Sequence, residues 1–136
     1  RPAAMVYLSD HGEDIYDDSR HRFLHASPTP TFWQLHVPML VWMSDAYRRR
    51  HPDKYLAAIG NGSKNVSSSR SAFHTLVSLA QIQTPCYRPY EALTEAAYKA
   101  PPRHYLNDYN EAVSLHDAGM RESDMHQLAR HHISAI

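Results

Sequence analysis

Residues 3–13 read AAMVYLSDHGE, an apolar run that leads directly into four polar or small residues. The run from Ala3 to Ser9 is short and rich in strand-forming side chains. Such a run is typical of a strand buried on both faces, in a parallel or mixed sheet covered by helices. Side chains that follow such a strand project into the crevice where α/β proteins bind ligands. We therefore predict an α/β fold with a site just after this strand.

The four residues Asp10, His11, Gly12 and Glu13 have the chemistry of a metal site. A carboxylate beside an imidazole suits a divalent ion of the zinc or manganese type. Gly12 allows a sharp turn of the backbone, and Glu13 could orient a metal ligand by hydrogen bonding to it. The same letters also fit a plain turn, because Asp and Gly favour turns.

A polar segment separates this motif from a second apolar run. Residues 10–35 contain two prolines and predict a long loop, and loops of that length are usually functional or disordered. An acidic stretch within it (Asp14, Asp17 and Asp18) lacks the glycine and the spacing of a calcium loop. Residues 36–43, HVPMLVWM, predict a second buried strand. Pro38 places either the start of this strand or a sheet edge there.

Helices are predicted in the following segments. Residues 44–55 have helical composition, with a break at Pro52, and the glycines at 60 and 62 end the region. The next helix begins at one of the serines at 67–69, and we expect an apolar stripe to pack it into the core: Phe73, Leu76, Val77 and Ala80. Residues 83–103 predict irregular chain, 104–106 a short strand and 122–133 a last helix.

The composition of the 136 residues excludes some classes of function. Charge is balanced, with 14 basic and 14 acidic side chains, so a nucleic-acid partner is not indicated. The single cysteine, Cys86, cannot form an internal disulfide bond. No apolar run reaches the roughly 18 residues of a membrane span. The chain starts at Arg1 and enters a strand at once, so we expect it to be cut from a longer protein.

Three ordered motifs resemble one known group of enzymes. VYLSDHGED, then FLHASP, then QLHVPMLVW are similar to the C-terminal half of the alkaline-phosphatase-like sulfatase superfamily, and most of all to bacterial phosphoethanolamine transferases. The helix SAFHTLVSLAQI also resembles that group. The resemblance implies the C-terminal portion of a three-layer α/β/α sandwich. Residues 1–110 would form this portion of the catalytic domain, and 111–136 a tail with helical character.

The resemblance assigns roles to several residues. Asp10 and His11 match the pair that binds a catalytic zinc, in a site with one or two divalent metals. His25 matches the catalytic histidine that contacts the phosphoryl group or a second metal. The nucleophilic threonine of the family lies upstream, so the resemblance places it outside this chain. His36, at the start of the second strand, is a candidate substrate contact, although a hydrogen-bonded structural histidine is the simpler interpretation.

The resemblance also implies substrates, partners and a location. The headgroup of phosphatidylethanolamine would pass to the threonine and then to lipopolysaccharide, on lipid A or a core sugar. The partner of the chain would be the missing N-terminal part of the same protein. Uncovered sheet edges and apolar faces would favour association with it, or of the chain with itself. Family members have an inner-membrane region and a periplasmic catalytic domain.

Two alternatives remain open at this point. One is a sulfatase or a phosphoesterase of the same superfamily. Cys86 lies in CYRP, which does not fit the C-x-P-x-R order of the sulfatase nucleophile, but that motif would lie upstream in any case. The other is a non-catalytic fragment that is inert alone, because two protein ligands fall short of the three or four usual for zinc.

Overall fold

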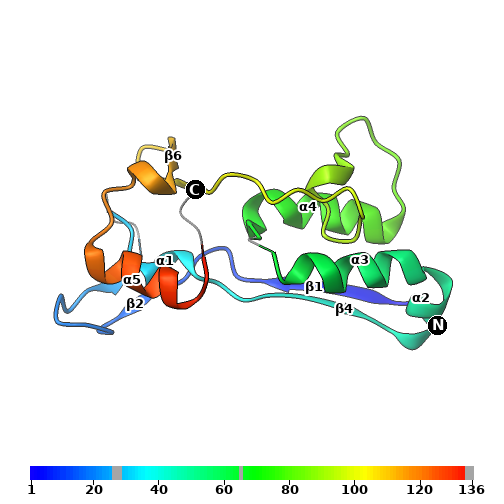
Figure 1. Cartoon of the computed structure of the whole chain (residues 1–136), viewed down its shortest axis with the longest axis horizontal. Helices are drawn as coiled ribbons and strands as arrows, with labels where there is room; N and C mark the ends of the chain where they lie inside the picture. Colours follow the sequence, from blue (N-terminus) through cyan, green and yellow to red (C-terminus); the bar gives the residue numbers. More distant parts are fainter. Residues whose placement is uncertain (26–28, 65, 134–136) are drawn as a thin grey trace. The chain divides into compact units, whose positions relative to one another are not determined.

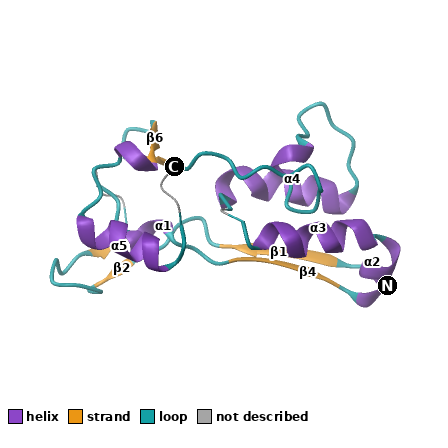
Figure 2. Cartoon of the chain, in the orientation of Figure 1, coloured by secondary structure: helices purple, strands orange, loops and turns teal. Residues whose placement is uncertain are grey.

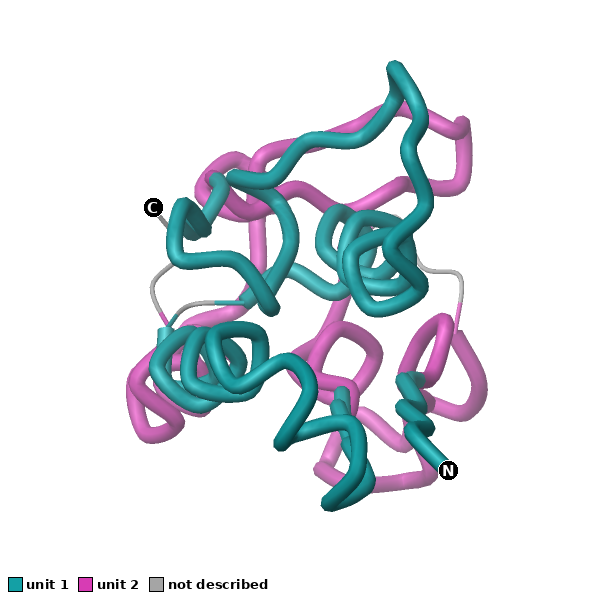
Figure 3. The backbone as a smooth tube through the Cα atoms, turned by 90° about the vertical axis from the view of Figure 1, so that its right-hand side faces the viewer, with its two compact units in different colours: residues 1–8, 39–101 teal, residues 9–38, 102–136 magenta. Residues whose placement is uncertain are grey.

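The chain forms two compact units in a computed structural model that describes residues 1–25, 29–64 and 66–133. The first unit comprises residues 1–8 and 39–101, and the second comprises residues 9–38 and 102–136 (Figure 3). Ala26, in the FLHASP motif, lies outside the described residues.

The first unit is built on a pair of antiparallel strands. Strand β1 (Ala4–Leu8) pairs with β4 (Met39–Met43), from Ala4 opposite Met43 to Leu8 opposite Met39. Both strands confirm the predicted ones, and β4 begins directly after Pro38, as the proline predicted. Helices α3 and α4 lie on one side of this pair (Figure 1). There Val6 and Val41 pack with side chains of α2, α3 and α4.

The expectation that the first strand is buried on both faces is wrong for this chain. On the other face, four apolar side chains are about half exposed: Met5 51%, Tyr7 53%, Leu40 57% and Trp42 51%. Side chains alternate between the faces of a strand, and the helices of this unit cover the Val6 face. The apolar run is therefore continuous even though one of its faces is open.

The helices of the first unit follow the predicted breaks. Helix α2 (Asp45–Arg50) is capped by Ser44, whose side chain accepts a hydrogen bond from the backbone N–H of Tyr47. Helix α3 (Pro52–Gly62) starts at Pro52, where the lack of an N–H costs nothing because the first turn has no partner for it. Helix α4 (Ser68–Ala80) has Ser67 as its N-cap residue, and the short 3-10 helix η1 spans Pro89–Glu91.

The predicted core stripe of α4 is wrong for three of its four residues. Val77 is buried, but Phe73 and Leu76 are 51% and 50% exposed, and Ala80 is exposed as well. The buried face is instead largely polar: Ser71, His74, Thr75 and Ser78. Three of these side chains, His74, Thr75 and Ser78, hydrogen-bond to the segment after the helix; Thr75, for example, accepts from the N–H of Leu93 at 3.0 Å. Hydrogen bonding thus allows polar groups to occupy the packed side.

The second unit consists of short elements joined by loops (Figure 2). Its elements are β2 (Asp14–Ile15), β3 (Phe23–Leu24), α1 (Phe32–Leu35), β5 (His104–Leu106), β6 (Ala112–Ser114), η2 (Leu115–Asp117) and α5 (Glu122–Arg130). The predicted loop at 10–35 therefore contains a small antiparallel hairpin, β2–β3, and one helical turn, α1. These elements are too short for a periodic pattern to reveal them.

The core of the second unit joins α1 to the C-terminal segment. Phe32, Leu115, Ala118 and Leu128 are buried together, with Trp33 packed against them. Residues 111–133 thus pack in the same unit as the segment after β1, and the boundary near residue 110 stays a prediction. Across the described part of the chain, no helix is both long and apolar enough to cross a membrane.

Candidate metal centre

The loop after β1 is held against α1 by its backbone. The N–H of Gly12 donates to the carbonyl oxygen of Gln34 at 2.8 Å. A Cβ atom at position 12 would overlap the carbonyl oxygen of Trp33, so this approach requires glycine. Ser9 Oγ adds a 2.7 Å hydrogen bond to the carbonyl oxygen of His11. Gly12 thus provides close approach to α1, and its role in a sharp turn stays a prediction.

The ring of His11 has a defined orientation. Its Nδ1 lies 3.0 Å from the carbonyl oxygen of Gly12, and because a carbonyl only accepts, Nδ1 must be the donor. In the neutral form of the ring the lone pair is then on Nε2, which faces Asp10 Oδ2 at 3.7 Å. Metal-binding histidines commonly have their second nitrogen fixed by a carbonyl or carboxylate in this way.

Asp10 is kept ionised by its surroundings. Hydrogen bonds from the backbone N–H groups of Asp10 and His11 lower the pKa of Asp10 below its ordinary value, and the charge of His11 acts in the same direction. The side chain is 88% exposed, so it is open to an ion from outside. Asp10 and His11 therefore present an oxygen and a nitrogen ligand next to each other.

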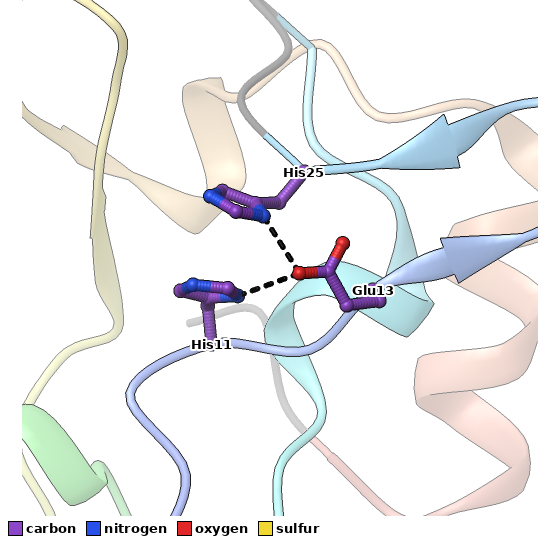
Figure 4. A group of neighbouring side chains, drawn as sticks. All are labelled: His11, Glu13 and His25. Atoms are coloured by element: carbon purple, nitrogen blue, oxygen red, sulfur yellow. Dashed lines mark hydrogen bonds and ion pairs between the residues drawn. The ribbon is translucent and has the colours of Figure 1, made fainter.

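Three further side-chain contacts form a cluster beside this pair (Figure 4). Glu13 Oε1 lies 2.8 Å from His25 Nδ1 and 3.5 Å from His11 Nδ1. The rings of His11 and His25 are 3.7 Å apart between centroids. His11, Glu13 and His25 each offer one ligand atom within 4.8 Å of the others, so the structure brings three of the predicted site residues together.

The donor set suits a divalent ion in either of two arrangements. An ion could lie between Asp10 and His11 Nε2, with Glu13 and His25 beside it, or among the three clustered side chains. The first arrangement agrees better with the His11 tautomer, because the Nδ1 hydrogen already points to Gly12. Glu13 Oε2 is buried and has no hydrogen-bond partner among the described residues, so it can accept a hydrogen bond from a ligand.

Behind the cluster lies a buried polar network that the sequence analysis missed. Asp14, 3% exposed, accepts hydrogen bonds from Thr31 Oγ1 and Gln34 Nε2, both at 2.7 Å. Thr31 is also the N-cap of α1, accepting from the N–H of Gln34 at 3.3 Å. The pattern T-x-x-Q is a helix-start signature and is the one signal that could have indicated α1.

His36 has a different environment. Its ring stacks on Phe32 at 4.8 Å between centroids and lies 5.0 Å from the ring of His131. Burial lowers the pKa of His36, and the charges of His131 and Arg103 lower it further. These contacts fit a packed, neutral histidine, and a substrate contact at His36 stays a prediction.

The family model described as Sulfatase matches residues 1–82, which include the whole site. The chain belongs to the sulfatase family. This sulfatase-family chain is 30% identical over 106 residues to the phosphoethanolamine transferase CptA of Salmonella typhimurium. Those residues make up 77% of the chain and 18% of CptA. It is 28% identical over 106 residues to EptC of Escherichia coli K12, with the same two coverages. The chain thus spans less than a fifth of the length of these curated relatives.

Solved structures show the fold class of this sulfatase-family chain. The C-terminal periplasmic domain of EptC from Escherichia coli, in complex with Zn, matches with a TM-score of 0.70 and 26% identity, over 89% of this chain and 33% of that one. A second crystal structure of the same domain matches with a TM-score of 0.67 and 27% identity, over 79% and 30%. The α/β prediction, as a portion of a sulfatase-type domain, is confirmed.

Proposed function

We propose that this chain is part of a metal-dependent phosphoethanolamine transferase. The enzyme would move the headgroup of phosphatidylethanolamine to a threonine outside this chain and then to lipopolysaccharide, on lipid A or a core sugar. The observation that best supports this is the paired arrangement of Asp10 with His11 and of Glu13 with His25. The names of the curated relatives favour this reaction over a sulfatase or another phosphoesterase of the same superfamily.

Asp10 and His11 would hold zinc in this proposal, as one of one or two divalent ions. The zinc-bound structure of the EptC domain supports this choice of metal. A bound divalent ion supplies Lewis acidity that stabilises charge on phosphoryl oxygens. Glu13 keeps the His25 imidazole in place through Nδ1, and the carbonyl oxygen of Gly12 does the same for His11. When protonated, His25 donates a hydrogen bond from Nε2 to a phosphoryl oxygen.

Zinc titration of the purified chain tests the metal site. We expect weak binding by the wild-type chain, since two protein ligands are fewer than zinc usually has. Asp10→Ala should abolish it. Asp45→Ala is the matched control, because Asp45 is also exposed but lies on α2, and its isotherm should equal that of the wild type. Equal binding by wild type and Asp10→Ala would count against this site.

For the isolated chain we propose no turnover, in line with the inert-fragment alternative. Nitrophenyl phosphate and nitrophenyl sulfate with added zinc provide the assay, and turnover that Asp10→Ala removes would refute this. In a longer protein containing the preceding portion, mass spectrometry of lipid A would report phosphoethanolamine addition. His25→Asn should reduce that addition while zinc binding persists.

The open face of the β1–β4 pair is the proposed contact with the preceding part of the domain. Its apolar residues Met5, Tyr7, Leu40 and Trp42 form a surface that monomeric proteins usually cover. By sedimentation, we expect the chain alone to self-associate and Trp42→Ser to reduce this. Leu56→Ser, at an apolar position on α3 that is also more than half exposed, is the control and should leave association unchanged. The location we propose is periplasmic with an inner-membrane anchor, supported by the periplasmic origin of the EptC domain.

A further inference from the structure

We propose that Asp14 is a positioning residue, which holds Glu13 and His25 in the geometry that the metal centre needs. The proposal rests on the proposed function, because it concerns the same site. Asp14 touches neither imidazole in the contacts described above; its effect passes through the hairpin that carries Glu13 and His25.

The register of the β2–β3 hairpin links Asp14 to the cluster. Asp14 pairs with Leu24, so the next facing positions of this antiparallel ladder are Glu13 and His25. These two residues are the ones whose side chains meet at 2.8 Å. Any shift or twist of the hairpin at Asp14 would therefore move Glu13 and His25 relative to each other.

A two-residue pairing cannot fix that geometry alone. Isolated two-stranded hairpins are marginally stable in water, and each strand here has only two paired residues. Leu24 also adopts a positive φ of 71°, a conformation that L residues take only when their surroundings impose it. The hairpin therefore needs an external support.

The buried carboxylate of Asp14 provides this support. Its two oxygens separately accept from Thr31 Oγ1 and Gln34 Nε2 on the start of α1, and Arg22 Nε lies 3.6 Å from Oδ2. Gln34 Nε2 also lies 3.4 Å from the carbonyl oxygen of Leu24, so one amide joins both strands to α1. The backbone carbonyl oxygen of Gln34 in turn accepts a hydrogen bond from the N–H of Gly12. The metal loop and the hairpin are thus tied to the same helical turn.

This supporting role requires a carboxylate at position 14. Thr31 and the Gln34 amide both donate to it, so the site requires an acceptor at each oxygen. An asparagine has nearly the same shape but places an NH₂ group where one acceptor stood. Either Thr31 or the Gln34 amide then loses the acceptor it donates to, and the negative charge that faces Arg22 is removed in both cases. Asp14→Asn is therefore a nearly isosteric change that removes one of the two acceptors and the charge, and so loosens the tie between the hairpin and α1.

Two measurements on the 136-residue chain test the proposal. The first is the nuclear Overhauser effect between the ring protons of His11 and His25, which needs no metal. The second is zinc affinity by calorimetry. Glu91→Gln is the matched control. Glu91 is 4% exposed and is bound by Arg70 and His74 in the other unit, so this substitution also replaces a buried, paired carboxylate with an amide.

We expect Asp14→Asn to lose the ring-to-ring effect and to bind zinc about ten-fold more weakly, with the chain still folded by circular dichroism. Glu91→Gln should lower the unfolding midpoint and leave both readouts at wild-type values. An Asp14→Asn variant that retains the ring contact overturns the proposal. The proposal also fails if Glu91→Gln weakens the ring contact as much as Asp14→Asn does. If the wild-type chain binds no zinc, the metal site itself fails, and the ring contact still decides the role of Asp14.

Discussion

Removing the carboxylate of Asp124 should destabilise the second unit more than any exposed substitution. Asp124 is 1% exposed and receives three hydrogen bonds: Arg20 Nη1 at 2.6 Å, Arg20 Nη2 at 3.0 Å and the N–H of Phe32 at 3.0 Å. The Arg20 side chain is itself only 10% exposed. Asp124→Ala would leave the poorly solvated guanidinium of Arg20 with Asp18 but without its buried carboxylate partner, and the backbone N–H of Phe32 without its acceptor.

The magnitude follows from this burial. Breaking a buried ion pair from one side costs about 3–5 kcal/mol of unfolding free energy, against about 5–15 kcal/mol in total for a domain. Part of that cost should return in Asp124→Ala/Arg20→Met, because the guanidinium that lost its buried partner is gone. We expect a coupling energy of about 1–3 kcal/mol between the two substitutions.

Urea unfolding followed by tryptophan fluorescence is the assay. The chain has two tryptophans, and Trp33 packs against the core of the second unit, so Trp42→Phe makes the signal specific to that unit. Asp108→Ala is the control, because Asp108 is exposed, and its effect should stay within about 0.5 kcal/mol. If Asp124→Ala costs no more than Asp108→Ala, the reasoning from the buried pair is refuted.

Three other outcomes are expected. Gly12→Ala should cost about 1–3 kcal/mol and weaken zinc binding, because its Cβ meets the backbone of α1, whereas Gly60→Ala, with open space around it, should not destabilise the chain in the same melts. Asn61→Ala should cost about 1–3 kcal/mol in urea titrations, because its buried Nδ2 donates to two backbone carbonyls at 2.9 Å each. The Arg20 side-chain hydrogen bond lowers the pKa of Asp18 from 3.8 to about 2. Its stabilising effect is therefore present above the unfolded value and lost as the pH falls toward about 2, and Asp18→Asn should flatten the decline of the urea midpoint across that interval.

Strand and helix boundaries were predictable where a single residue decides them. Pro38 fixes the start of β4, and Ser44 and Pro52 fix the starts of α2 and α3, because each has one strong backbone preference. Asp10, His11 and His25 could also be predicted as neighbours, but only from a resemblance between motifs. Nothing in their spacing along the chain requires the 3.7 Å contact between the two rings.

The residues that support the site were not predictable, for a physical reason. Asp14 was recognised only as part of an acidic stretch that does not fit a calcium loop. Its burial depends on donors that lie seventeen and twenty residues away at Thr31 and Gln34. The predicted apolar stripe of α4 is wrong for a similar reason. Hydropathy favoured Phe73 and Leu76 for the core, whereas the helix buries polar side chains whose partners lie beyond it. Tertiary hydrogen bonds of this kind leave no periodic trace in a sequence.

The pairing of Leu8 with Met39 has an evolutionary consequence. Residues 9–38 leave the strand pair and return to it at adjacent points, so this excursion can grow or shrink without disturbing the ladder on either side. Where the added residues are not packed, each doubling in loop length adds only about 0.6 kcal/mol in closure entropy. Descendants of one ancestral gene could therefore acquire different substrate preferences by insertions and deletions here, while the strands that anchor the excursion stay unchanged.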